Sequence, residues 1–321
     1  MSGAPHQQPR GNGRSASRCT VSVVIASVGR PRVLHETVLS ILEQDHLPEE
    51  IVISVPAIEH VDSRTPPLPR VRCVISPQGS CVQRNRGVRA MAKNAELVAF
   101  LDDDVELDPD YLRVVAETFA AHPDLVAANG DLIADGGPTQ RFSRNEARAM
   151  LERRAAERPV EANRWLIDSG RIHGCHFTVR RSVFETLEFD ERLPLYGWLE
   201  DVDLGRSCRK LGRVGCIGGA RLVHLAEKGG RTSGLRYGFS QVMNPAYLRS
   251  KGNYTFAECM KNWRLALASN VLGTMSLNRN KFERLQGNFI ALWMLLRGRI
   301  DPEHVTRLGL LDAVRPGGSG G

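Results

Sequence analysis

The sequence predicts an α/β fold in which helices flank a Rossmann-like, mostly parallel central sheet, with a helical region towards the C-terminal end. Two observations support this expectation. Between residues 20 and 131, short β-branched runs alternate with helical patterns, which is typical of βαβ units and a parallel sheet. Beyond Gly229 the apolar residues instead keep helical spacing, as at Trp263, Leu267 and Val271.

Four strands are predicted in the first half, each a short run of mainly apolar residues. They are expected at residues 20–26, 51–55, 71–75 and 96–101. Pro31 suits the first position of a helix, and Leu34, Val38 and Ile41 follow it at helical spacing. A second helix is expected at about 79–94, so strands and helices alternate as far as the fourth strand.

In the second half, the pattern of apolar and polar residues is different. A polar helix is expected near 143–157, because Ser143 and Glu146 form the pattern of a capping box. The other elements expected here are strands around 165–172 and 177–179, a helix at 199–211, and short strands at 214–217 and 221–224. Strict alternation of strands and helices is lost, so this half is expected to differ from the first in architecture.

Composition narrows the class of protein. Seven cysteines without a CxxC pair fit neither a disulfide framework nor a zinc ribbon, which predicts reduced thiols in a cytoplasmic protein. The best candidate for a membrane span, residues 289–296, is far shorter than the roughly 20 residues required. The net charge of +7 is either solvated or suits an anionic lipid surface or phosphorylated substrate. Nucleic acid is not expected as a partner, because the basic residues are dispersed and no binding motif is present.

Three aspartates, Asp102, Asp103 and Asp104, follow the fourth strand, at the carboxyl end where open α/β sheets bind ligands. In extended chain the side chains of Asp102 and Asp104 point to the same side, while Asp103 turns away. Mg²⁺ and Mn²⁺ prefer such oxygen ligands and accept the rest of their shell from phosphates and water. The pattern therefore favours a divalent metal site over the alternative, a helix cap near Pro109.

A second acidic cluster, Glu200-Asp201-Val202-Asp203, comes about a hundred residues later and begins the predicted helix at 199–211. A carboxylate placed beside an attacking hydroxyl can accept its proton as a general base. The alternative is that these acids only favour the N-terminus of the helix through its dipole. Together with the first cluster, the catalytic interpretation is favoured.

The order of these motifs resembles glycosyltransferase family 2, whose members have the GT-A fold. The resemblance covers roughly residues 21–224. It rests on the strand Val21-Ser22-Val23-Val24-Ile25, the turn ending in Arg30-Pro31, the element Arg84-Asn85-Arg86-Gly87, the DxD motif Asp102-Asp103-Asp104, the segment 174–181 and the base motif Glu200-Asp201-Val202-Asp203-Leu204.

This resemblance implies an inverting transfer from a nucleotide sugar to a hydroxyl acceptor, of the hexosyl- or deoxyhexosyltransferase type. It implies Asp201 as the base, Glu200 orienting the acceptor, and His224 beside Asp102 and Asp104 as a ligand of Mn²⁺ or Mg²⁺. Substrate contacts are expected from Arg30, Arg84, Asn85, Asp102, Asp103, Gly174 and Trp198. The acceptor is expected to be a glycan precursor of polysaccharide biosynthesis, a lipid-linked glycan or a small molecule. Because the Gln-x-x-Arg-Trp element of processive synthases is absent, addition of a single sugar is expected.

The expected domain organisation follows from these assignments. Residues 1–18 and 316–321 are predicted to be disordered tails, and residues 19–228 the catalytic domain, with 19–131 binding the nucleotide sugar and 132–228 the acceptor. Residues 229–315 form the helical region. Its apolar residues Phe289, Trp293 and Leu296 lie near basic residues, so this face either packs on the catalytic domain or makes peripheral contact with the inner face of the cell membrane.

Two other functions stay open at this point. A sugar nucleotidyltransferase would need a Gly-rich loop with Arg and Lys near the first strand, and the segment 26–30 fits that poorly. A noncatalytic nucleotide- or glycan-binding module would not need both acidic clusters.

Overall fold

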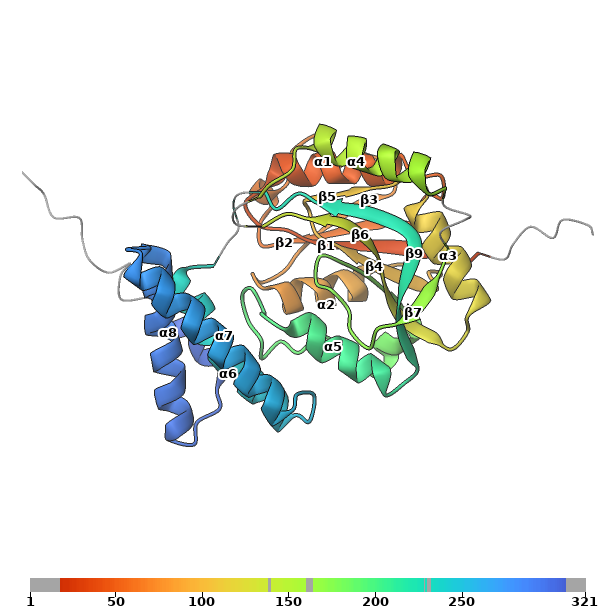
Figure 1. Ribbon diagram of the computed structural model, residues 1–321. Helices are drawn as coiled ribbons and strands as arrows, with labels where there is room; N and C mark the ends of the chain where they lie inside the picture. Colours follow the sequence, from red (N-terminus) through yellow and green to blue (C-terminus); the bar gives the residue numbers. More distant parts are fainter. Residues whose placement is uncertain (1–17, 138–139, 160–163, 228, 230–231, 310–321) are drawn as a thin grey trace, which may run out of the picture.

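The computed structural model describes residues 18–137, 140–159, 164–227, 229 and 232–309. Apart from Arg18, the predicted tails at 1–18 and 316–321 lie outside these residues. The four strands predicted in the first half are β1 (Val21–Ala26), β2 (Ile51–Val55), β3 (Val71–Ile75) and β4 (Leu97–Leu101). They lie in the order β3-β2-β1-β4 and are all parallel, which confirms the α/β prediction (Figure 1).

Helices cover both faces of this sheet, which explains why β2 and β4 are buried along their whole length. One face is covered by α1 (Pro31–Leu42) and α3 (Tyr111–Ala121), the other by α2 (Ser80–Ala90) and α5 (Glu200–Arg209). Because side chains alternate along β1, Val23 and Ile25 enter the first core and Val24 enters the second. The helix predicted at 79–94 ends four residues early, since Met91 has extended backbone.

In the second half, the structure differs from the sequence-based predictions at two strands. The sequence analysis did not predict β6 (Leu125–Asp135), because Asn129 and Gly130 interrupt its apolar pattern. The short strands predicted at 214–217 and 221–224 are one strand, β9 (Arg213–His224). The glycines between them resemble a turn, but Gly218 is needed for packing. A Cβ at Gly218 would lie 2.3 Å from the ring of Trp165.

The remaining strands complete a mixed sheet of nine strands among the described residues, in the order β3-β2-β1-β4-β8-β6-β9-β5, with β7 also paired to β9. They are β5 (Val105–Leu107), β7 (Leu166–Asp168) and β8 (His176–Arg180), each of which runs antiparallel to its neighbours. The strand predicted at 165–172 is thus only three residues long. The capping box predicted at Ser143 is present at the start of α4 (Arg144–Glu157). Short 3₁₀ helices are η1 (Ile58–His60), η3 (Arg181–Glu185) and η4 (Pro302–Arg307).

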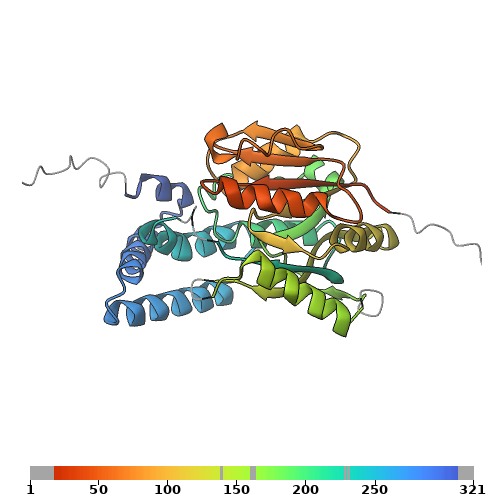
Figure 2. The same ribbon diagram turned by 90° about the horizontal axis from the view of Figure 1, so that it is seen from above.

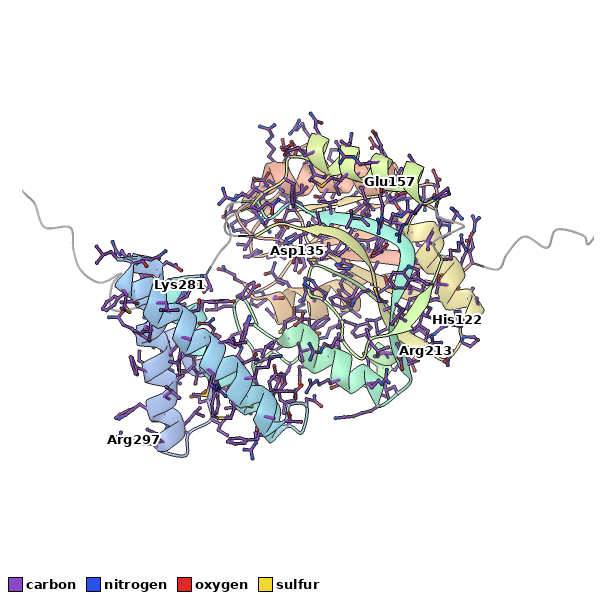
Figure 3. All side chains as sticks on the ribbon, in the orientation of Figure 1. His122, Asp135, Glu157, Arg213, Lys281 and Arg297 are labelled. Atoms are coloured by element: carbon purple, nitrogen blue, oxygen red, sulfur yellow. The ribbon has the colours of Figure 1, made fainter. Side chains whose placement is uncertain are left out.

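Three long helices follow, α6 (Gly234–Ser250), α7 (Phe256–Met275) and α8 (Arg279–Leu296), and they lie beside the sheet rather than on one of its faces (Figures 1 and 2). Lys281 and Arg297 mark the two ends of α8 (Figure 3). Helices α6 and α8 approach closely because Gly238 and Gly287 face the partner backbone, where a Cβ would lie 2.0 to 2.1 Å from a carbonyl oxygen. No helix among the described residues is long and apolar enough to cross a membrane.

The C-terminal helices contact the sheet and the helices that precede them in the chain. Tyr247 and Leu248 of α6 belong to the same apolar core as Phe100 of β4 and Leu204 of α5. The Arg206 side chain of α5 forms an ion pair with Glu258 of α7. The acidic helix α5 is therefore in contact with both α6 and α7.

Candidate active site

The three aspartates after β4 lie at the carboxyl end of the parallel strands, as predicted. The backbone N–H of Asp102 donates to the carbonyl oxygen of Cys175, 3.0 Å away, which fixes this turn against the start of β8. The side chain of Asp102 is 35% exposed, whereas those of Asp103 and Asp104 are buried. Asp102 is therefore the most accessible of the three carboxylates.

Asp103 and Arg30, both predicted to bind substrate, contact one another. The guanidinium of Arg30 pairs with the carboxylate of Asp103 and reaches Oδ2 of Asp104 at 2.7 Å. The hydroxyl of Ser27 also donates to Asp103. Burial raises the pKa of Asp103 to about 7, although Arg30 opposes the shift. A contact of either residue with substrate stays a prediction.

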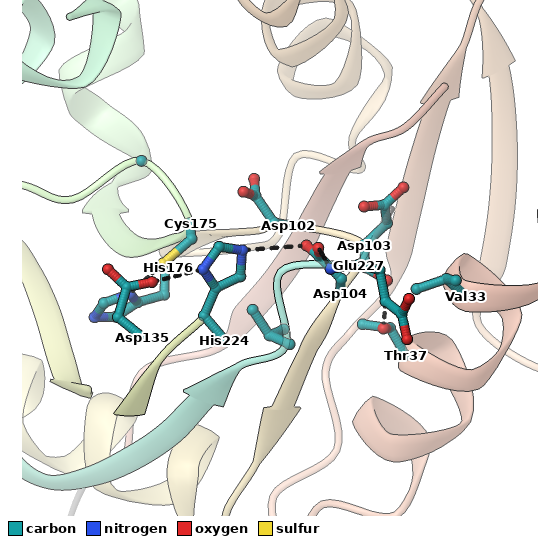
Figure 4. Close-up of polar contacts among 12 residues, drawn as sticks. Val33, Thr37, Asp102, Asp103, Asp104, Asp135, Cys175, His176, His224 and Glu227 are labelled. Atoms are coloured by element: carbon teal, nitrogen blue, oxygen red, sulfur yellow. Dashed lines mark hydrogen bonds and ion pairs between the residues drawn. The ribbon is translucent and has the colours of Figure 1, made fainter. Parts of the chain in front are cut away.

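Asp102, Asp104 and His224, the three predicted metal ligands, lie together. Each offers one ligand atom, and these atoms lie within 4.8 Å of one another. Oδ1 of Asp104 is buried and accepts no hydrogen bond, while Nε2 of His224 lies 3.5 Å from it (Figure 4). A buried carboxylate oxygen without a donor is costly unless a cation satisfies it. The residues therefore fit a hard divalent cation such as Mn²⁺ or Mg²⁺.

Asp135 orients the ring of His224. The two residues are opposite one another in the pairing of β6 with β9, and Oδ1 of Asp135 lies 2.7 Å from Nδ1 of His224 (Figure 4). Burial alone would lower the pKa of His224, but the contacts with Asp104 and Asp135 outweigh burial and raise it to about 9. A carboxylate on the far nitrogen is the usual partner of a metal-binding histidine. The sequence analysis missed Asp135, since β6 itself was not predicted.

Glu200 and Asp201 are the first residues of α5, and a sharply bent loop delivers them. Gly197 and Leu199 have φ values of +63° and +72°, and the N–H of Glu200 donates to the carbonyl oxygen of Gly197. Burial raises the pKa of the Glu200 carboxyl to about 7. Asp201 is only half-buried, and its Oδ2 accepts the N–H of Gly174 at 2.9 Å. Asp201 is thus the more accessible carboxylate of the pair.

Arg84 connects the two acidic clusters. Its buried guanidinium pairs with Glu200, lies 3.4 Å from Oδ1 of Asp102, and donates to the carbonyl oxygen of Gly174 at 2.8 Å. The rings of Phe177 and Phe189 lie 5.5 Å from it. The sequence analysis expected Arg84 to meet substrate, and the structure places it between the carboxylates.

Asn85 and Trp198, two further predicted substrate contacts, have intramolecular partners. The amide of Asn85 donates to the carbonyl oxygen of Phe189 and accepts its N–H, both at 2.9 Å. The ring of Trp198 lies edge-on to that of Tyr237, with centroids 6.2 Å apart. Tyr196 lies next to the same tyrosine and is 56% exposed.

Parallel strands that end at three aspartates, Asp102-Asp103-Asp104, faced by a second acidic cluster on a later helix, define a protein of the GT-A glycosyltransferase class. Solved structures agree with this fold. GalNAc-T7, solved with UDP, GalNAc and Mn²⁺, superposes with a TM-score of 0.54 at 15% identity, over 88% of this chain and 59% of that one. Mannosyltransferase PcManGT from Pyrobaculum calidifontis, solved with GDP-Man and Mn²⁺, gives 0.51 at 14% identity, over 89% and 91%.

The family follows from sequence comparison. The model of the glycosyltransferase-like family 2 matches residues 18–227, so this chain belongs to that family. A curated relative, Glucosyl-dolichyl phosphate glucuronosyltransferase from Haloferax volcanii, is 34% identical over 124 residues. The match covers 36% of this chain and 39% of the relative, so it spans about two-fifths of that protein.

Proposed function

We propose that this protein is a metal-dependent, inverting glycosyltransferase that moves one sugar from a nucleotide-sugar donor to a hydroxyl acceptor. The observation that carries the proposal is the pair of acidic clusters, Asp102/Asp104/His224 and Glu200/Asp201, connected through Arg84. In this proposal residues 19–131, together with His224, bind the donor, and the rest of residues 132–228 bind the acceptor. The family match favours this function over a sugar nucleotidyltransferase or a noncatalytic binding module.

The donor side is proposed to hold a divalent cation at Asp102, Asp104 and His224. When bound, the cation would stabilise the negative charge of the leaving diphosphate as a Lewis acid. Oδ1 of Asp104 is buried, makes no hydrogen bond and has only the ion-pair contact with His224, which supports this assignment, and so does the presence of Mn²⁺ in both solved structures of similar fold. Arg30 holds Asp104 from the other side and so keeps its carboxylate in place.

The acceptor side is proposed to use Asp201 as the base that takes the proton of the attacking hydroxyl. Its partial exposure and its hydrogen bond from Gly174 give an accessible carboxylate with a fixed orientation. Glu200 is buried in an ion pair with Arg84 and is proposed to orient the acceptor. The name of the archaeal relative supports a lipid-linked acceptor among the classes considered, ahead of a free glycan or a small molecule.

The proposed activity is tested by measuring nucleotide release from a panel of sugar nucleotides, with Mn²⁺, with Mg²⁺ and with EDTA. One donor is expected to be consumed in the presence of metal, and consumption is expected to stop with EDTA. Pyrophosphate release in place of nucleotide release would indicate the nucleotidyltransferase.

Nucleotide binding itself is expected to depend on metal, because the protein supplies only part of the shell of the cation and the diphosphate supplies more. Asp104→Ala should weaken binding of the matching nucleoside diphosphate by at least about 10- to 100-fold in calorimetry, the loss typical even for outer-shell changes. Asp124→Ala, at an exposed aspartate with a side chain 63% accessible, is the control and should bind normally. Equal affinity with EDTA and in Asp104→Ala would refute the metal assignment.

The C-terminal helices are proposed to contact an anionic membrane surface. Phe289, Trp293 and Leu296 are 59%, 53% and 86% exposed, so this face does not pack on the catalytic domain. Leu272 and Met275 of α7 are also exposed, at 64% and 76%. The sequence from 229 to 309 holds twelve Lys or Arg against four Asp or Glu, so this region accounts for the positive net charge of the chain. Apolar side chains beside cations bind anionic bilayers.

Cosedimentation with vesicles of anionic phosphatidylglycerol is therefore expected at low salt, with weaker binding as salt screens the charges. The double variant Phe289→Ser/Trp293→Ser should remain in the supernatant. Ile167→Ser on β7 removes a side chain of similar exposure, 58%, and serves as the matched control. If the unaltered protein stays in the supernatant at low salt, the membrane proposal fails.

A further inference from the structure

A second group of metal-ligating side chains lies beside the acidic site, in the turn that precedes β8. His173, Cys175 and His176 each offer one ligand atom, and these atoms lie within 4.8 Å of one another. Sγ of Cys175 is 3.2 Å from Nδ1 of His173 and 3.1 Å from Nδ1 of His176. A zinc ion bonded at about 2.3 Å to sulfur and about 2.0 Å to nitrogen reaches pairs of atoms at such separations.

The outer nitrogens of the two histidines lie near oxygen atoms of neighbouring residues. Nε2 of His176 lies 3.3 Å from the carbonyl oxygen of Gly130, an acceptor that requires the proton on this nitrogen. Nε2 of His173 lies 3.9 Å from Oδ2 of Asp135. In the ring of His176 the lone pair is therefore left on Nδ1, the atom that faces Cys175, and Nδ1 of His173 faces the same sulfur. Outer-shell carbonyl and carboxylate partners of this kind fix the tautomer and orientation of metal-binding histidines.

We propose that His173, Cys175 and His176 form a second metal site, which takes a borderline or soft divalent cation such as Zn²⁺ and leaves its fourth position to water. Thiolate and imidazole ligands select such cations over Mg²⁺ or Mn²⁺, which distinguishes this site from the oxygen-rich site at Asp102 and Asp104. Cys175 and His176 are buried, whereas the side chain of His173 is 50% exposed and gives the cation access from solvent. On binding, the Cys175 thiol loses its proton to water as the metal–sulfur bond forms.

A metal at this site would stabilise the turn that contacts the carboxylate of Asp201. Gly174 stands between two of the ligands, its N–H donating to Asp201 and its carbonyl oxygen accepting from Arg84. Asp135 also connects the two sites, since one of its oxygens contacts His224 and the other faces His173 (Figure 4 shows Asp135 beside His224, Cys175 and His176). A cation on His173, Cys175 and His176 would fix this turn without occupying the donor site.

Titration with Co²⁺ tests the site without any need for activity, because a cobalt–thiolate bond gives a charge-transfer absorption in the near ultraviolet. Metal-free protein should develop this band and saturate at one equivalent, and Cys175→Ser should abolish it. Cys73→Ser, at a half-buried thiol on the outer strand β3, is the matched control and should keep the band. Asp104→Ala should also keep it, which separates this site from the donor site.

His173→Gln provides a second test, because its exposed position lets the chain fold around the change. Zn²⁺ affinity, measured by competition with a chromophoric chelator, should fall by about 100-fold or more, since loss of an outer-shell partner alone costs about 10- to 100-fold. The proposal is overturned if the unaltered protein gives no thiolate band, if the band survives Cys175→Ser, or if His173→Gln binds Zn²⁺ normally.

Discussion

Asp201→Asn is expected to lower kcat by about 10²- to 10⁴-fold, the usual contribution of a positioned general base. The amide is nearly the same size as the carboxylate, and its oxygen can still accept the N–H of Gly174, but it cannot take a proton at neutral pH. Donor affinity should stay close to that of the unaltered protein, because among the described residues Asp201 forms no hydrogen bond or ion pair with Asp102, Asp104 or His224. Comparing the rate of transfer with nucleotide affinity from calorimetry separates chemistry from binding.

Glu200→Gln is the informative comparison. Normal transfer by Asp201→Asn together with loss in Glu200→Gln would reverse the roles of the two residues. Full activity of both variants would reduce the cluster to a helix start with no part in the reaction. Asp168→Asn on β7, an exposed aspartate paired with Arg209, is the control for a change of charge alone and should be active.

Arg84→Met is expected to reduce the free energy of unfolding by about 3–5 kcal/mol, because it leaves Glu200 as a buried charge without its partner. Both side chains are less than 10% exposed, so water cannot take over the role of the guanidinium. Without Arg84, Glu200 should bind a proton more readily, because burial already raises its pKa and the guanidinium no longer opposes that shift. Chemical denaturation at pH 7 measures the change.

The double variant Arg84→Met/Glu200→Leu shows whether the ion pair or the packing of Arg84 between Phe177 and Phe189 is responsible. If the pair is responsible, removing both charges should restore much of the stability, and the two changes should be strongly non-additive. Additive losses would mean that Arg84 stabilises the fold through its contacts with the rings.

The parallel part of the fold could be predicted because its local pattern and its tertiary role agree. Strands such as β2 are continuous apolar runs, since both faces of the sheet are covered. β6 and β9 could not be predicted in full, because glycines at positions 130, 218 and 219 look like turns in the sequence. In the structure Gly130 and Gly218 stand where a Cβ would collide with Tyr111 and Trp165, so close packing rather than a turn explains them.

The candidate site could be predicted by residue type but not by partner. The two acidic clusters follow from strand ends and helix starts, and His224 follows from the family resemblance; the structure brings Asp102, Asp104 and His224 together. The pairing of Arg30 with Asp103 and of Arg84 with Glu200 could not be predicted from the sequence. The first two residues are 73 positions apart and the second two are 116 positions apart, so each pair meets only through the tertiary fold.

Because α6 shares an apolar core with the sheet, the C-terminal helices cannot be separated from the rest of the fold. Tyr247 and Leu248 fill the same core as Phe100 and Leu204, and Lys251 forms ion pairs with Asp190 and Asp203. A chain cut at residue 228 would expose this apolar surface to water and would strip Asp203 of its cation, on the helix that carries Asp201. The last helices are therefore not a detachable anchor that could be exchanged between enzymes, and any chimaera must place its junction beyond residue 251.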